Sequence, residues 1–171
     1  MSDKQSTEFE ELWEHWYQEI YSENKVDYEH LNQISSELNK DWNTDFVNAF
    51  LKQKIRSPFH PQINSDKYIG MELISQLGEA TQKALFSELL YIGSSPNGYR
   101  ERAFAIVKSM PRDWVLSHLE ECVEPFLAFE DWGEYVSFLG LYREISPALE
   151  ERLIKRIREH PSAEIREILE E

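Results

Sequence analysis

Five histidines and one cysteine are the side chains of this chain best suited to binding a metal or attacking a substrate. No two histidines stand three or four residues apart, so no helix can present two imidazoles to one ion. Glu11 and His15 have the i, i+4 spacing of a shared ligand pair, but the Glu-x-x-His motif that di-iron bundles repeat is absent. A surface Glu–His pair is the better explanation, and we expect neither a metal nor a cofactor.

Cys122 is the candidate nucleophile, and its neighbours argue against that role. It shares a helical stripe with the apolar residues Leu116, Leu119, Val123 and Phe126. It is flanked by the acidic residues Glu120, Glu121 and Glu124. Their charges would raise the pKa of the thiol, whereas a nucleophilic cysteine needs a lowered pKa. We predict a buried, unreactive thiol. Because no phosphate-binding loop occurs either, we predict that the chain is not an enzyme.

The composition predicts that these side chains stand on helices. The chain has 171 residues, of which 41% are hydrophobic and 13% aromatic, enough to form a packed core. Gly (6) and Pro (7) are sparse, and most prolines fall between periodic apolar runs. No long stretch alternates apolar and polar residues as a strand would. We predict a single all-α domain over residues 1–171.

A three-helix segment is predicted for residues 1–56. Thr7 to Glu10 have the form of a capping box, which predicts a helix start at Thr7. The other two predicted helices cover residues 27–40 and 44–55. Prolines at 58 and 61 then predict a loop over residues 57–65.

From residue 66 onward the chain is predicted to form helix pairs. Two helices are expected first, from Asp66 to a stop at Gly78 and from Ala80 to a stop at Gly93. Two similar units follow. One comprises residues 99–110, a break at Pro111 and residues 114–123; the other comprises residues 131–145, a break at Ser146-Pro147 and a helix to 159. A third copy begins at Pro161-Ser162.

The two units align residue by residue. In the first helices an offset of 35 residues matches Phe104 with Leu139, Ile106 with Leu141, Val107 with Tyr142 and Met110 with Ile145. In the second helices an offset of 38 matches Val115 with Leu153, Leu116 with Ile154 and Leu119 with Ile157. Repeats of this length are typical of stacked, antiparallel helix pairs, which present an open binding surface.

Pro125 bears on the boundary between the first unit and the second. Pro125 cannot lie within a straight helix, so the helix from Trp114 is expected to end or kink near Glu124. Residues 126–129 would then form a connector. The chain is expected to restart at Asp131, where Asp131 to Glu134 repeat the capping-box pattern.

Two helix starts carry an apolar residue followed by arginine, Tyr99-Arg100 and Ile165-Arg166, each after a turn that contains proline. In this feature residues 66–171 resemble HEAT-like repeats. The resemblance implies an α-solenoid in which Arg100 and Arg166 tie neighbouring repeats together. It also implies a binding scaffold, although some relatives serve DNA repair or bilin-lyase enzymes. The middle copy departs from the pattern, because Tyr135-Val136 lacks the arginine.

The net charge of −14 restricts the partners. Phosphate binding needs a basic face, so direct binding of nucleic acid and of anionic membranes is disfavoured. A basic protein is the partner that such a charge attracts fastest. Acidity that serves only solubility is the alternative. The lone cysteine and the absence of a targeting segment predict a cytoplasmic protein.

Residues 113–142 contain no Lys or Arg, and we call this stretch the acidic seam. Its aromatic residues include Trp114 and Phe126, which we expect in the core, and Trp132, for which exposure and burial are equally expected. Exposed aromatics among like charges are typical of electrostatically steered interfaces. The predicted partner-binding residues are Asp113, Glu120, Glu121, Glu124, Glu130, Asp131, Trp132 and Glu134.

These observations predict an acidic protein-binding module that is a monomer when free. Its most concrete form is a bacterial immunity or inhibitor protein, which neutralises a basic, nuclease-type toxin by covering its active surface. The alternative is a HEAT-like adaptor in a larger assembly, or a relative of the bilin lyases. A DNA-repair enzyme on the same scaffold would need a basic face, which Lys52, Lys54, Arg56 and Lys67 could barely supply.

Overall fold

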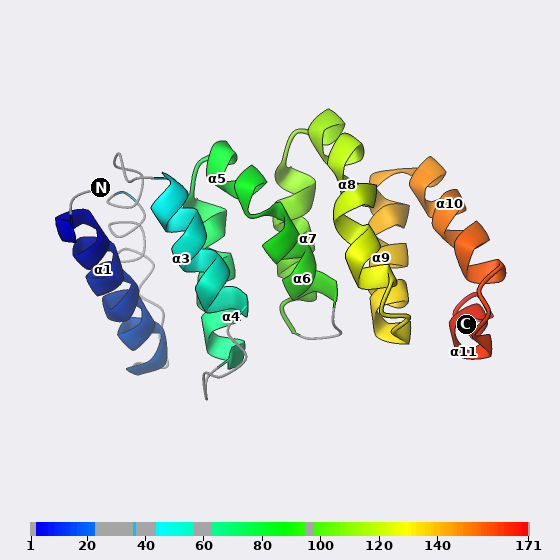
Figure 1. Cartoon of the computed structure of the whole chain (residues 1–171), viewed down its shortest axis with the longest axis horizontal. Coiled ribbons are helices and arrows are strands. Elements are labelled where there is room, and N and C mark those ends of the chain that lie inside the picture. Colours follow the sequence, from blue (N-terminus) through cyan, green and yellow to red (C-terminus); the bar gives the residue numbers. More distant parts are fainter. Residues whose placement is uncertain (1–2, 23–35, 37–43, 57–62, 95–97, 171) are drawn as a thin grey trace. The chain divides into compact units, whose positions relative to one another are not determined.

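The computed structural model describes residues 3–22, 36, 44–56, 63–94 and 98–170. All regular secondary structure in these ranges is helical, which confirms the all-α prediction (Figure 1). Internal contacts divide the chain into two compact units, residues 1–85 and 86–171. Each unit is described by itself.

The first unit contains α1 (Asp3–Ser22), α3 (Thr44–Arg56), α4 (Ile63–Gln76) and α5 (Glu79–Ala84). Its core brings aromatic rings of α1 and α3 together. Phe9 meets Phe50 edge-on at 5.2 Å between ring centroids, and Trp13 meets the same ring at 5.4 Å. Helix α4 packs against α3, where the missing side chain of Gly70 leaves room for Ile55.

The structure corrects several predicted boundaries in this unit. Helix α1 begins before Thr7, which is therefore not its cap. Helix α3 confirms the helix predicted over 44–55. Of the helix predicted over 27–40, only residue 36 is described, and it is helical; the rest lies outside the described residues, as do residues 57–62 of the predicted loop, while residues 63–65 belong to α4.

The single helix predicted from Ala80 to Ile92 is wrong. The chain forms α5 and then α6 (Phe86–Ser94), separated by Leu85, whose φ of −105° and ψ of 16° interrupt the helix. Leu85 is fully buried, so its side chain holds the break in place. Gly93 does not end the second helix either; a β-carbon there would clash with the ring of Phe104.

The second unit continues with α7 (Arg100–Ser109), α8 (Arg112–Leu127), α9 (Trp132–Ile145), α10 (Pro147–Arg158) and α11 (Ala163–Glu167). Helix α6 packs on α7 and α8, and α9 packs on α10 and α11. The predicted breaks at Pro111 and at Ser146-Pro147 are confirmed as the N-caps of α8 and α10. Ser162 likewise precedes α11, where the third copy was predicted to begin.

Aligned positions of the two repeat units have the same burial. Six of the seven matched pairs are buried at both positions, and Leu116 and Ile154 are both half-buried. Consecutive pairs are also tied by long-range bonds, such as that from Arg112 Nη2 to the carbonyl of Ile145 (2.8 Å). The internal repeat is therefore a repeat of packing as well as of sequence.

Pro125 does not end α8, although an end near Glu124 was one of the two predicted effects of this proline, the other being a kink. The helix continues to Leu127, and the amide of Ala128 still bonds to the carbonyl of Glu124 (3.1 Å). Pro125 lacks only the amide that would bond to Glu121, and both residues are exposed, so water can satisfy that carbonyl. Phe126 and Leu127 thus complete the helix and are buried.

Among the helices in the described ranges, none combines the length and apolarity that crossing a lipid bilayer requires.

Candidate functional site

The predicted partner-binding residues occupy α8, the turn after it and the start of α9. Asp113 lies in the first turn of α8, and Glu120, Glu121 and Glu124 lie further along the same helix. The other four follow between residues 130 and 134. All the acidic residues are exposed except Glu134, which is half-buried, as is Trp132. The acidic seam is thus at the surface, but its members differ in their partners.

Glu120 and Glu124 are already paired within the chain. The carboxylate of Glu120 accepts two hydrogen bonds from Arg152 of α10, both 2.8 Å long. Glu124 accepts two from Arg156, at 2.6 and 3.0 Å. We call these two ion pairs the α8–α10 ladder. Because each glutamate is paired with an arginine, the ladder presents little net negative charge to a partner.

Arg156 also fastens the end of α8 to α9. Its Nε donates to the hydroxyl of Tyr135 (3.2 Å), which in turn donates to the carbonyl of Leu127 (3.3 Å). The guanidinium lies 5.9 Å from the centre of the Tyr135 ring, within range of a cation–π contact. The ladder therefore belongs to the framework that fixes the position of the turn between α8 and α9.

Between α8 and α9, the chain makes a turn that we call the acidic turn: Phe129, Glu130, Asp131, Trp132 and Glu134. Phe129 is 78% exposed, and among the described residues it is the one large hydrophobic residue that is exposed. Glu130 has φ of +57°, a left-handed conformation that side chains other than glycine adopt at a cost. Asp131 caps α9 by accepting a hydrogen bond from the amide of Glu134 (3.2 Å), as predicted.

Glu134 completes only half of the predicted capping box. Its Oε2 is buried and has no hydrogen-bond partner. Burial, followed by the nearby charge of Asp131, raises the pKa of the Glu134 carboxyl. Within the described part of the chain, no ion pair involves Glu130, Asp131 or Glu134. The acidic turn is thus a site of uncompensated negative charge around an exposed aromatic ring.

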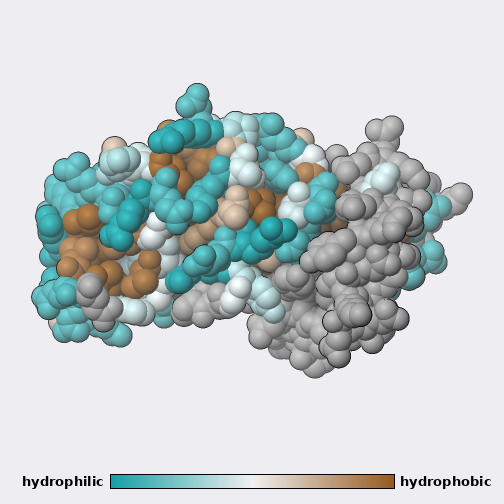
Figure 2. Space-filling view, turned by 180° about the vertical axis from the view of Figure 1, so that it is seen from behind, coloured by the Kyte–Doolittle hydropathy of each residue, from teal (hydrophilic) through white to brown (hydrophobic). Residues whose placement is uncertain are grey.

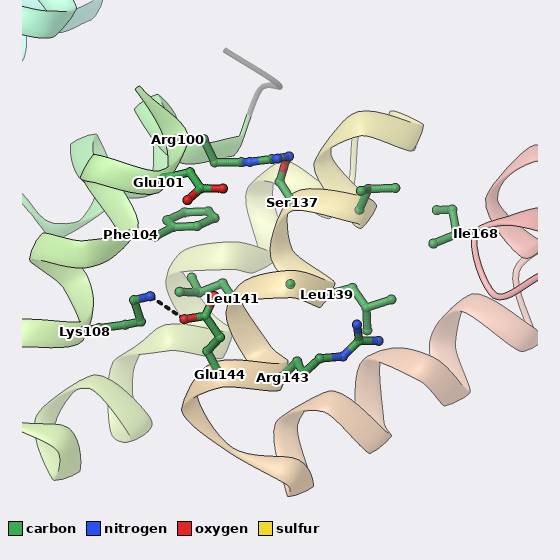
Figure 3. Close-up of a pocket in the computed structure, with 12 residues that line it drawn as sticks. Arg100, Glu101, Phe104, Lys108, Ser137, Leu139, Leu141, Arg143, Glu144 and Ile168 are labelled. Atoms are coloured by element: carbon green, nitrogen blue, oxygen red, sulfur yellow. Dashed lines mark hydrogen bonds and ion pairs between the residues drawn. The ribbon is translucent and has the colours of Figure 1, made fainter. Parts of the chain in front are cut away.

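A groove between α7 and α9 was not predicted from the sequence (Figure 3). Its volume is about 400 Å³. In Figure 3 α9 runs through the middle of the site, with the α7 residues on one side and Ile168, just after α11, on the other. The lining residues used below are Arg100, Phe104, Lys108, Leu139, Gly140 and Ile168. On the face opposite to that of Figure 1, hydrophobic surface gathers at the C-terminal end of the chain, where α9 and α11 lie (Figure 2).

A second hollow of about 140 Å³ adjoins the groove. The two share Lys108 and Glu144, whose ion pair lies in their common wall. Arg143 on the rim is held by Glu150 (2.8 Å). Arg100 is less engaged, because among the described residues its Nη1 makes only a long hydrogen bond of 3.4 Å to Ser137 Oγ. Figure 3 shows the two side chains meeting at one end of the groove. The groove thus has an apolar floor and a mixed charged rim, in which Arg100, next to Glu101, makes no ion pair within the described residues.

The two arginines singled out by the resemblance differ in their contacts. Arg100 reaches from α7 to α9, which lies in the next helix pair. Arg166 instead donates to the carbonyls of His160 (2.5 Å) and Pro161 (2.8 Å), both in the turn directly before α11. Arg166 therefore stabilises its own turn.

Nothing around Cys122 resembles a catalytic site. The residue is half-buried, where full burial was predicted. Its pKa is raised by burial and by the charges of Glu121 and Glu88, so the thiolate is disfavoured, as predicted. The ring of His118 stacks on that of Trp114, with 4.3 Å between centroids, and its Nδ1 forms a hydrogen bond with the Trp114 carbonyl oxygen (2.8 Å). These contacts are those of a packed side chain. In the described ranges, no cluster of His, Cys, Asp and Glu is arranged to hold a metal ion.

No protein-family model, curated protein or solved structure matches this chain.

Proposed function

We propose that this chain is an acidic protein-binding module and that the acidic turn is the centre of its interface. One observation carries the proposal: Phe129 is 78% exposed, and the acidic residues beside it have no cation within the described chain. An exposed aromatic ring gives the fold little packing and offers apolar area for contact with another molecule, and here it stands among carboxylates that would attract a basic one.

The physical chemistry of the turn favours a basic partner. Phe129 supplies apolar area that is desolvated on binding, while Glu130, Asp131 and Glu134 attract positive charge during encounter. Trp132, half-buried beside them, extends the aromatic surface. Glu134 is held in a partly buried position where its charge is unfavourable, and a cation from a partner would relieve that cost.

The most concrete form of this function is an immunity or inhibitor protein. Such a protein would act in the cytoplasm as a free monomer and would neutralise a basic, nuclease-type toxin by covering its active surface. A net charge of −14 supports this form, because a nuclease that binds phosphate presents positive charge. On this proposal the chain binds the toxin in place of nucleic acid and does no chemistry itself.

The framework we propose is a HEAT-like stack of helix pairs. The equal burial of aligned positions in the two repeat units supports it, as do the bonds that link consecutive pairs across 32 to 37 residues. Such a stack is rigid enough to hold a binding turn in one conformation.

The groove between α7 and α9 supports a second candidate, an adaptor in a larger assembly. An inhibitor needs one interface, whereas an adaptor needs two. A groove with chemistry unlike that of the acidic turn would serve as the second.

A pull-down from the native host with two matched variants tests the proposal. Phe129→Ser combined with Glu130→Lys removes the aromatic ring and reverses one charge of the turn. The control is Glu10→Lys, which makes the same charge change at an exposed position of α1. It leaves the neighbouring ring of Phe9 in place, because Phe9 is buried and its replacement would disturb the core. We expect a basic protein that the wild type and the control retain, and whose affinity for the turn variant falls about tenfold or more. Equal binding by all three proteins, or recovery of acidic partners alone, would refute the proposal.

A further inference from the structure

The groove between α7 and α9 contains a glycine that the fold itself does not require. Gly140 lies within α9 and is exposed, and a β-carbon built on it meets no atom within 4 Å. Glycine in a helix interior is unfavourable relative to alanine, because the unfolded chain gains freedom and the helix gains nothing. Its φ is not positive, so no special backbone conformation explains it.

Two other helical glycines show what a structural requirement looks like. A β-carbon at Gly93 would clash with the ring of Phe104, and one at Gly70 would come within 2.8 Å of Ile55 Cγ1. Both positions are buried, and glycine there lets helices pack closely. Gly140 has no such neighbour among the described residues. A glycine here leaves the helix backbone open to the approach of another chain.

The dimensions of the groove suit a short extended segment. Its α7 wall runs from Arg100 to Lys108, a separation of eight helical steps and therefore about 12 Å. That is the length of about four residues of extended chain. The floor contains Phe104, Leu139 and Ile168, each at most 8% exposed, so the centre of the groove favours aliphatic side chains.

The charge at one end of the groove specifies the segment further. Lys108 and Arg143 are neutralised by Glu144 and Glu150, whereas Arg100 has only its long bond to Ser137 among the described residues. A guanidinium in that position has donors available for a carboxylate, which it binds in bidentate geometry. This requirement is opposite in sign to that of the acidic turn.

We propose that the groove between α7 and α9 binds an extended segment of a partner protein, about four residues long, which pairs an Asp or Glu side chain with Arg100 and lays aliphatic side chains over Gly140. The segment would belong to a protein, because the groove offers apolar contact along its length as well as one cation. The inference concerns a different surface from the acidic turn and does not depend on the proposed function.

The test uses the full chain and a library of N-acetylated, C-amidated octapeptides. Each peptide contains one Asp or Glu among aliphatic and small residues, and its matched partner has the corresponding amide. Binding is measured by fluorescence anisotropy for the peptides that the wild type enriches. We expect replacement of the acid by the amide, or Arg100→Gln in the protein, to weaken binding about tenfold, with little further loss when the two changes are combined.

Two glycine variants separate the groove from the rest of the surface. Gly140→Leu fills the groove and should abolish binding, while circular dichroism and an unchanged or raised melting temperature confirm that α9 is intact. Gly78→Leu is the matched control, because Gly78 also has nothing within 4 Å of its β-carbon and lies in the other unit. It should bind like the wild type, as should Phe129→Ser, whose failure to affect the peptide separates this inference from the proposed function.

Three outcomes would overturn the inference. The first is enrichment of no acidic peptide over its amide partner. The second is binding that survives Gly140→Leu. The third is binding of acetate or propionate alone with the same dependence on Arg100, because that result would make the site a simple anion site.

Discussion

Glu124 near the end of α8 and Glu130 in the turn that follows belong to one acidic stretch of sequence, yet the fold uses them in different ways. Glu124 is held by Arg156 through two hydrogen bonds, and Glu120 is held by Arg152 in the same manner. Within the described part of the chain, Glu130, Asp131 and Glu134 make no ion pair. The comparison teaches that a run of like charge in a sequence sets only an upper limit on the charge a surface presents.

The turn also differs from the ladder in its conformational strain. The ladder glutamates stand in regular helix, while Glu130 adopts a left-handed conformation for which glycine is better suited. The ladder glutamates stabilise the fold, whereas the turn departs from what stability alone would select. This contrast is why we place the interface in the turn, and the following predictions test it.

Breaking the ladder at Arg156 should have the largest effect on stability. Arg156→Leu removes the ion pair to Glu124 and leaves the hydroxyl of Tyr135 without its donor, so we expect the free energy of unfolding to fall by about 1.5 kcal/mol. Arg158→Leu, on the same helix and exposed, is the control and should change it by less than about 0.5 kcal/mol. Urea denaturation measures both. Equal losses for the two variants would show that the ladder contributes nothing specific.

Relieving the strain of the turn should raise stability. Glu130→Gly allows the left-handed conformation without a β-carbon, and we expect a gain of about 1 kcal/mol after the added freedom of the unfolded chain is counted. The same change at the exposed helical residue Glu151 should instead cost about 1 kcal/mol. Melting temperatures with opposite shifts would confirm the prediction. A loss at both positions would mean that Glu130 is not strained.

The uncompensated charge of the turn should appear as a smaller, pH-dependent effect. The pKa of Glu134 is raised above its ordinary value of 4.5. At pH values just above 4.5, the folded state therefore still holds a proton that the unfolded state has released. The free energy of unfolding therefore falls as the pH rises through that interval. Glu134→Gln should stabilise the chain at pH 7, by about 0.5 kcal/mol or less, and should lose this advantage at a pH of about 4. An advantage that is the same at both pH values would contradict the account.

Local features of this chain were predicted from sequence more reliably than its long-range pairings. The breaks at Pro111 and Ser146-Pro147 and the cap at Asp131 depend on neighbouring residues, and all were predicted. The break at Leu85 was missed, because its signal is a buried leucine with no proline or glycine beside it. That α8 continues past Pro125 was not predicted, because it depends on two features of the fold. The proline lies near the end of the helix, and Glu121 is exposed, so water can satisfy its carbonyl.

The candidate sites divide in the same way. Phe129 to Glu134 are contiguous in the chain, so charge and capping patterns pointed to the turn. The pairing of Glu120 with Arg152 joins residues 32 positions apart, which sequence spacing does not reveal in a degenerate repeat. The groove needs α7, α9 and Ile168 together, and no single segment carries its signature. Gly140 was the one local signal of the groove, because it is a glycine inside a helical pattern at a position where no turn is predicted.

The most direct test of the central claim compares the ladder with the turn in one binding measurement. Glu120→Gln with Glu124→Gln, and Glu130→Gln with Glu134→Gln, remove the same number of charges. The association rate constant with the partner recovered by pull-down is measured at an ionic strength of about 0.15 M, where charges more than about 8 Å from the interface are largely screened. We predict that the turn variant associates about fivefold more slowly and that the ladder variant changes by less than about twofold. A slower ladder variant beside an unaffected turn variant would contradict the account.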